Sequence, residues 1–245
     1  MGLAHDDGWC IPADAPFYPA LPAIYRNVKF HFLFFKSLPQ AVSHYLPEPL
    51  EPDPDGTCVV SGVDVSFCTN YGPFQETFLV LKCKFRGVTG YYCSHMFHNG
   101  PSGIAAGREI YGTPKIYASM SVRQAGRSML SEASMGGVQV FRLSTITEQV
   151  VPSRTMPPLT PAWRLKVIPR ADGPGPAIKQ LIDCSKMTKD LIVHFFARGR
   201  GTLELTASPL IDLSPLQPVS CGDAFYMECD YSEHYAEIVY DYLKK

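Results

Sequence analysis

The sequence predicts a mainly β fold, an antiparallel β-barrel or sandwich with a few short helices. Short runs of alternating apolar and polar residues follow one another along the chain, as is typical of strands buried on one face. Turn formers separate these runs, and the 245 residues include 22 prolines and 19 glycines. Hydrophobic residues make up 46% of the chain and charged residues 18%, so it can bury a sizeable core as one large β domain or two small ones.

The N-terminal part combines an irregular arm with the first strand. Residues 1–26 are rich in proline and lack periodicity, so we expect an extended arm laid over the domain or over a neighbouring subunit. Residues 27–36 predict a strand with three phenylalanines on one face. Ser37 is a suitable N-cap for a short helix over residues 38–46.

The middle of the chain predicts a succession of strands joined by glycine turns. Arg86-Gly87 is a tight link that indicates a hairpin, and Gly126 and Gly136-Gly137 mark later turns. The expected strands cover residues 57–67, 76–85, 90–97, 115–123, 127–133 and 138–147.

The last third begins with four prolines between residues 150 and 161, which predict a long loop or a domain linker. Glycine-rich stretches at 172–176 and 198–201 are interpreted as turns between strands. Residues 232–243 fit a helix or a final strand. The strands expected here cover residues 163–168, 177–184, 190–197, 201–207 and 224–230.

Charge and cysteine usage exclude several classes of function. The net charge of −1 gives no electrostatic reason to bind nucleic acid or an anionic membrane. The eight cysteines contain no Cys-x-x-Cys pair, and no apolar run is long enough to span a membrane. We therefore expect a soluble cytoplasmic protein with reduced thiols.

The common motifs for metal, nucleotide and hydrolase chemistry are also missing. His95 and His98 are three residues apart on an expected strand, so they point to opposite faces and make a poor metal pair. There is no Gly-x-Ser-x-Gly elbow and no glycine-rich phosphate loop. We expect neither a metal nor an organic cofactor.

Residues 107–117 carry the strongest candidate for chemistry. Pro114 donates no backbone hydrogen bond and favours an extended Thr113, so the chain turns and Lys115 opens a strand. Ile116 then faces the opposite side. A lysine at the start of a core strand can lose its hydration, which lowers its pKa and frees an amine that attacks carbonyls. The alternative is a lysine that snorkels to solvent, which is the commoner arrangement for a lone lysine.

The run Gly-Arg-Glu-Ile-Tyr-Gly-Thr-Pro-Lys over residues 107–115 resembles the signature of the acetoacetate decarboxylase family. Further matching motifs, in the same order as in the family, are Leu-Pro-Glu-Pro-Leu-Glu at 46–51, Trp-Arg-Leu-Lys-Val-Ile-Pro at 163–169 and the close at 236–244. The resemblance crosses the proline-rich stretch at 150–161. It therefore implies a single domain over residues 1–245, with the arm at its start.

The resemblance also implies the site. It gives Lys115 the role of the lysine that forms a Schiff base with a keto acid, and Glu76 that of the active-site glutamate, which would orient the substrate or relay a proton. A solvated carboxylate at a strand end is the alternative for Glu76. Tyr111 in the signature and His95 in the preceding strand are expected to contact the substrate. Arg108 is interpreted as structural.

Three positions depart from the family pattern. Ile116 stands where these decarboxylases carry a second lysine, Val28 where they carry an arginine, and Ser61 where they carry a glutamate. We expect Val28 and Ile116 to border the substrate. A site without these charges suits a substrate that is larger or less acidic than acetoacetate.

The sequence thus predicts a Schiff-base lyase that decarboxylates a β-keto acid bulkier than acetoacetate. One alternative is an aldolase, dehydratase or cyclase that uses the same imine and enamine. A second is a non-catalytic module that binds a small anion through Lys115. The expected partners are a small keto compound and further copies of this chain, in a homo-oligomer.

Overall fold

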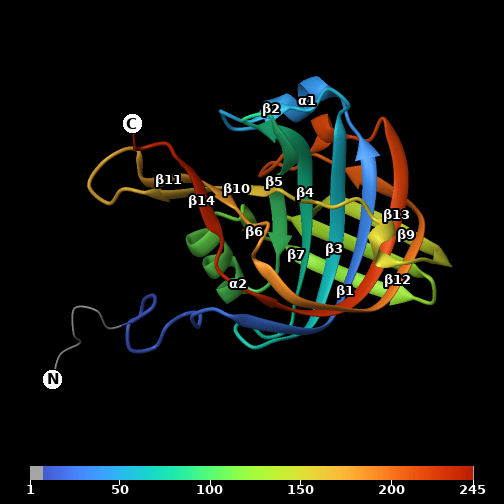
Figure 1. The fold of residues 1–245 in the computed structure, drawn as a ribbon, viewed down its shortest axis with the longest axis horizontal. Helices are drawn as coiled ribbons and strands as arrows, with labels where there is room; N and C mark the ends of the chain where they lie inside the picture. Colours follow the sequence, from blue (N-terminus) through green and yellow to red (C-terminus); the bar gives the residue numbers. More distant parts are fainter. Residues whose placement is uncertain (1–7, 245) are drawn as a thin grey trace.

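One strongly curved sheet of long strands organises the molecule (Figure 1). The computed structural model describes residues 8–244. The strand order is β14-β11-β10-β5-β4-β3-β1-β13-β12-β9-β8-β7, with β2 added beside β4 and β6 beside β5. The predicted mainly β class is confirmed. The sheet is mixed rather than purely antiparallel, because β10 and β6 both run parallel to β5.

The elements have the following bounds. The strands are β1 Ala23–Lys36, β2 Glu51–Pro52, β3 Thr57–Cys68, β4 Phe74–Phe85, β5 Val88–His98, β6 Lys115–Tyr117, β7 Ser119–Ala125, β8 Ser128–Met135, β9 Val138–Val150, β10 Ala162–Pro169, β11 Pro176–Asp183, β12 Thr188–Leu205, β13 Ser220–Glu233 and β14 Glu237–Asp241. The helices are α1 Pro39–His44 and α2 Pro101–Ala106, which continues into a π-helical turn at Gly107–Tyr111. Short 3-10 turns lie at Ser153–Thr155 and Ser214–Leu216.

The sheet curls until β7, at one end of the strand order, meets β4 in its interior. The side-chain amide of Gln75 on β4 forms two hydrogen bonds with the backbone of Val122 on β7, as a neighbouring strand would. Its Nε2 donates to the Val122 carbonyl at 3.0 Å, and its Oε1 accepts from the Val122 N–H at 3.0 Å. This contact joins β7, at one end of the strand order, to β4 in its interior. The enclosed core is apolar and includes Leu33, Leu81, Phe97, Phe141, Leu143 and Leu205.

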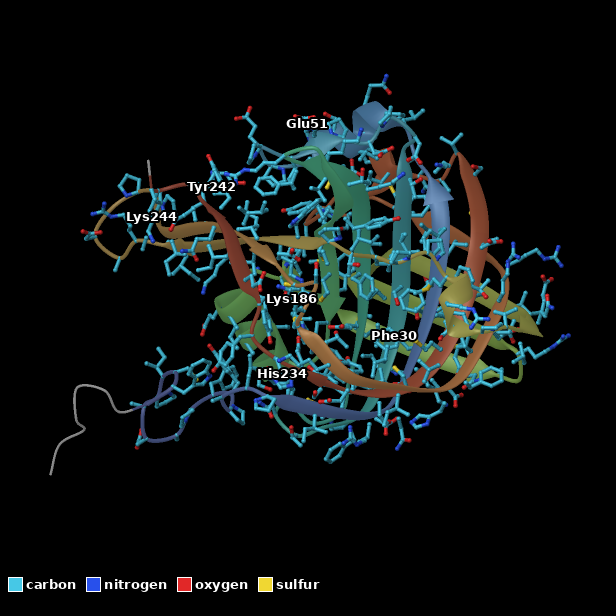
Figure 2. The ribbon with its side chains drawn as sticks, in the orientation of Figure 1. Phe30, Glu51, Lys186, His234, Tyr242 and Lys244 are labelled. Carbon is cyan, nitrogen blue, oxygen red and sulfur yellow. The ribbon has the colours of Figure 1, made fainter. Side chains whose placement is uncertain are left out.

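The long strands lie next to one another in the curved part, while β11 and β14 form an extension that ends near the C-terminus (Figure 1). Figure 2 places Phe30 in the curved part and Lys244 at the tip of this extension. Of the predicted arm, residues 1–7 lie outside the described chain. Tyr18 of the arm is buried and bonds to Glu109. No described helix is long and apolar enough to cross a membrane.

Several predicted boundaries were wrong for identifiable reasons. The strand expected at 115–123 is divided into β6 and β7, because the Ala118 N–H turns to the His98 carbonyl at 3.1 Å. The turn expected at 198–201 does not exist. Here β12 continues, and Gly199 lets β9 come so close that a Cβ would meet the Ile146 carbonyl oxygen. Ser37 does not cap α1, whose N-cap is Leu38.

Other predictions agree with the structure. The Arg86-Gly87 hairpin is present, and both residues have positive φ, at 51° and 80°. Residues 232–243 include a final strand, β14, rather than a helix. The stretch at 150–161 is a loop with a single 3-10 turn. The signature before Lys115 differs, because it is helical rather than a simple turn.

A buried histidine joins β1 to the strands across the core. His31 is fully buried, with Nδ1 at 2.8 Å from Thr145 Oγ1 and Nε2 at 2.6 Å from Ser131 Oγ. Burial lowers the pKa of His31 to about 3. The imidazole is therefore neutral in the folded protein over the whole physiological range.

This histidine predicts a loss of stability in mild acid. A histidine in the unfolded chain has a pKa of about 6.5. Below that pH, His31 binds a proton in the unfolded chain but not in the folded protein. The unfolding free energy is therefore greatest above about pH 6.5 and decreases as the pH falls toward 3. Between pH 7 and pH 5 this one group should cost about 2 kcal/mol of unfolding free energy.

Urea unfolding at the two pH values tests this expectation. The pH-dependent loss should shrink by about 2 kcal/mol in His31→Gln. The exposed His44, changed to Gln, is the matched control and should leave the loss as in the native protein. An equal pH dependence in His31→Gln and the native protein would contradict the assignment.

Candidate active site

A cavity of about 280 Å³ opens between the long strands and the signature segment. Its polar end is formed by the signature, β4, β10 and the end of β13. Its apolar end is formed mainly by side chains of β1, β4 and β5. This apolar wall consists of Phe30, Phe32, Phe78, Val80, Tyr91 and Met227. The cavity therefore has a charged end and an extended aromatic end.

The signature segment aims Lys115 into the polar end. The π-helical turn ends at Gly112, which has φ of 70°, and the Thr113 N–H returns to the Gly107 carbonyl at 2.9 Å. β6 then begins at Lys115, as predicted. The lysine stem lies against Gly107, where a Cβ would come within 2.8 Å of Lys115 Cδ. The signature glycine thus leaves room for the lysine.

Lys115 meets Glu76 inside the cavity. Its Nζ lies 3.2 Å from Glu76 Oε2 and 5.6 Å from the centre of the Phe74 ring. The two side chains are only 12% and 14% exposed. Burial opposes the ionisation of Glu76, but the neighbouring positive groups, Lys115 foremost and Arg164 among them, together outweigh it, so the pKa of Glu76 lies below its usual value. The pair is a largely desolvated ammonium and carboxylate.

His98 supports this pair from the neighbouring strand. It is the cross-strand partner of Glu76, is fully buried and stacks on Phe74 at 4.3 Å. Gly100 N–H donates to its Nδ1 at 2.7 Å, so the proton of the neutral ring is on Nε2, which lies 3.8 Å from Glu76 Oε2. Burial and the charge of Lys115 lower the pKa of His98 to about 3. The Nε2–H of a neutral imidazole therefore lies near the carboxylate, at a distance beyond hydrogen bonding.

Two further charged groups line the polar end. Arg164 on β10 donates from Nη1 to Thr113 Oγ1 at 2.6 Å, and its guanidinium lies 5.7 Å from the Tyr111 ring. Glu233, the last residue of β13, accepts a hydrogen bond from the Tyr25 hydroxyl at 2.5 Å. Burial raises the pKa of Glu233, although the charge of Lys115 opposes this. The two carboxyl groups thus have pKa values shifted in opposite directions, the arrangement that separates an acid from a base.

The structure brings some of the predicted site residues together and leaves others outside. Lys115, Glu76 and Tyr111 line the cavity, and the Tyr111 hydroxyl donates to the His234 carbonyl at 2.7 Å. His95 does not line it. Its ring packs instead against Tyr45 at 5.3 Å, on the other side of β5.

The positions that depart from the family pattern lie behind the cavity wall. Val28 is fully buried in a cluster that includes Val63 and Phe74, and Ile116 packs against the main core. Neither lines the cavity. Ser61 is buried on β3, between Phe32 and Phe78 in register.

Arg108 and Glu109 of the signature both make their contacts outside the cavity. Arg108 donates to the Lys115 carbonyl at 3.1 Å, which is a structural contact on the backbone. Glu109 accepts the hydrogen bond from Tyr18 of the arm at 2.5 Å.

Sequence reasoning did not identify Arg164, Glu233 or His98 as site residues. Arg164 did carry a signal, because it is a permanent charge inside an apolar strand whose neighbour Trp163 is buried. Glu233 carried none, since it stands at a strand end where an exposed carboxylate is the usual case.

The chain resembles a well-defined group of proteins. A family model described as acetoacetate decarboxylase matches residues 11–243. Acetoacetate decarboxylase 2 of Mesorhizobium japonicum is 27% identical over 243 residues, which cover 97% of this chain and 90% of that protein. The crystal structure of acetoacetate decarboxylase from Legionella pneumophila superposes with a TM-score of 0.86 at 22% identity and covers 100% of both chains.

A solved structure with a different named role has the same fold. The enduracididine biosynthesis enzyme MppR, complexed with the condensation product of pyruvate and imidazole 4-carboxaldehyde, superposes with a TM-score of 0.83 at 18% identity. The match covers 99% of this chain and 100% of that one.

The turn before Lys115 predicts a specific destabilisation. Gly112 has φ of 70°, and a Cβ there would lie 2.3 Å from the Lys166 backbone, so Gly112→Ala meets both strain and a clash. Gly72 has φ of 68° with open space around it, so Gly72→Ala meets the strain alone. We expect Gly112→Ala to lower the unfolding free energy by about 1–3 kcal/mol more than Gly72→Ala does. Equal losses in urea unfolding would show that β10 is not held against Gly112.

Proposed function

The chain belongs to the acetoacetate decarboxylase family, and on this basis we propose that it is a Schiff-base-forming lyase that decarboxylates a β-keto acid bulkier than acetoacetate. The observation that supports this most is the buried contact of Lys115 Nζ with Glu76 Oε2 at 3.2 Å, in a cavity large enough for a substrate. An amine next to a carboxylate in a mostly apolar cavity has both a route to lose its proton and a site for a ketone.

In the proposed reaction Lys115 supplies the nucleophile. Its proton passes to Glu76, and the neutral amine adds to the ketone carbon of the substrate. The carbinolamine loses water, with a proton from the carboxyl group, and a protonated imine forms. The buried pair exchanges one proton in these steps, so that the charge of the iminium replaces the charge of the ammonium beside Glu76.

The iminium then accepts the electrons of the breaking bond. The bond between the carboxylate carbon and the α-carbon breaks, carbon dioxide leaves, and the electron pair forms an enamine with the imine nitrogen. Protonation of the α-carbon restores the imine, and water releases the ketone and the free lysine. Glu76 and Glu233 are the two carboxyl groups in the cavity that can carry the protons of these steps.

The aromatic end of the cavity supports a substrate larger than acetoacetate. The whole cavity has a volume of about 280 Å³, and its aromatic wall has few polar groups to hold water in place. A buried methylene contributes about 0.8 kcal/mol. An alkyl or aryl tail on the ketone side of the substrate would fill this end.

A second candidate is an aldolase, dehydratase or cyclase that uses the same imine. The likeness in fold to MppR, which is complexed with a condensation product of pyruvate and an aldehyde, favours keeping this alternative. A module that only binds a keto acid without turning it over is the third reading.

Carbon dioxide release measured over a substrate series tests the proposal. From acetoacetate to 3-oxohexanoate and 3-oxo-5-phenylpentanoate, kcat/KM should rise about fourfold for each methylene that enters the apolar end. If the proposal on substrate size is wrong, acetoacetate will have the highest kcat/KM of the series. Product formed from pyruvate and an aldehyde, without carbon dioxide release from any 3-oxo acid, would favour the aldolase instead.

Glu76 provides a test of the proton route. Glu76→Gln keeps the size of the side chain but cannot take the proton of Lys115, so kcat should fall by about 10²- to 10⁴-fold, the range of a lost general base. The matched control is the exposed Glu204, changed to Gln, which should keep the native rate. A Glu76→Gln protein with native kcat would exclude Glu76 from the proton transfers.

A further inference from the structure

Arg164 is a cation inside the cavity that no carboxylate neutralises by direct contact. Within residues 8–244, no Asp or Glu oxygen lies within 4.0 Å of its guanidinium. Its side-chain contacts are to Thr113 Oγ1 at 2.6 Å and to Met187 Sδ at 3.9 Å, and both use Nη1. In the described part of the chain, Nε and Nη2 make no hydrogen bond.

A guanidinium with no carboxylate in contact is suited to bind an anion. Arginine stays charged at all accessible pH values, so burial cannot be relieved by losing a proton. Arg164 is half-buried in the cavity wall, and a charge in such a site is normally paired, because leaving it unpaired costs free energy. The two free nitrogens are those on the Nε side of the guanidinium, which match the two oxygens of a carboxylate.

The contact with Thr113 fixes where this anion would lie. Thr113 is two residues before Lys115, in the turn that aims the lysine, and its carbonyl accepts the Lys115 N–H at 2.7 Å. Arg164 is therefore held by the same turn that holds the amine. Lys115 and Arg164 both line the cavity, so it offers an amine for a ketone and a guanidinium for a carboxylate.

We propose that Arg164 binds the carboxylate of the substrate through Nε and Nη2 while the ketone reacts with Lys115. This inference rests on the proposed function, since it assigns the second group of the keto acid. The cavity holds two basic groups, Lys115 and Arg164, beside Glu76 and Glu233. Glu76 contacts Lys115, whereas neither carboxyl group of the cavity contacts Arg164, so a substrate carboxylate can pair directly with Arg164.

The proposed contact also explains how product would be released. Loss of carbon dioxide removes the charge that Arg164 holds, so the neutral ketone binds less tightly than the acid. Arg164 also places a positive charge at this end of the cavity, although residues 28 and 116 are uncharged. This cation comes from β10, whereas the arginine of the family pattern would stand at position 28 on β1.

A binding cycle with a matched pair of ligands tests the proposal. In a Lys115→Met background, which forms no imine, 3-oxo-5-phenylpentanoate and its methyl ester are titrated against the fluorescence of Trp163, which lines the cavity. Adding Arg164→Met should weaken binding of the acid by roughly tenfold to over a hundredfold, and that of the ester by no more than about twofold. Arg164→Lys should restore part of the affinity for the acid.

Two controls separate this result from a structural effect. The exposed Arg170, changed to Met, should leave both affinities as they are. Thermal stability should fall little in Arg164→Met, because the change removes one hydrogen bond, to Thr113, together with a charge that no carboxylate contacts. Equal weakening of acid and ester, or no change for either, would overturn the proposal.

A separate experiment tests the proposed function. Borohydride reduction of the protein with native Lys115 and the same ester tests imine formation and does not depend on Arg164. If the protein forms no imine but binds the acid more tightly than the ester through Arg164, the proposed reaction is wrong and the proposed carboxylate site stands.

Discussion

A buried ammonium requires a buried counter-charge, and the contact between Lys115 and Glu76 meets that requirement. The surrounding structure holds both groups in place. The register of β4 and β5 sets Glu76 beside His98, whose Nε2 lies 3.8 Å from the carboxylate. The π-helical turn and Gly107 set the lysine stem. Glu76 and His98 lie on β4 and β5 inside the sheet, and Lys115 lies on the short strand β6, which pairs with β5.

The charges of the cavity are distributed differently from what the sequence suggests. Residues 28, 61 and 116 are uncharged, and from these positions alone the site would be expected to hold little charge. The structure instead supplies Arg164 from β10 and Glu233 from β13. These residues are 69 positions apart in the sequence, and only the curvature of the sheet brings them to the same end of the cavity. Pattern and spacing could not predict this, because neither residue has a local partner.

Sequence reasoning succeeded where a local rule decides the structure. Alternation predicted most strands and the opposite faces of Lys115 and Ile116, and positive φ at Arg86-Gly87 accompanies the expected hairpin. It failed where the tertiary structure overrides the rule. A register shift in β5 between Cys93 and His95 reverses the alternation, so Cys93 and Met96 line the cavity and His95 does not. Gly199 was taken for a turn, although its lack of a side chain serves the close approach of β9.

The central claim is that the amine of Lys115 forms the covalent bond to the substrate. The most direct measurement is reduction with borohydride in the presence of 3-oxo-5-phenylpentanoate, followed by mass spectrometry of the peptides. The account predicts that the added mass lies on the peptide that contains Lys115 and is absent without the keto compound. Added mass on another lysine, with Lys115 unmodified, would contradict it.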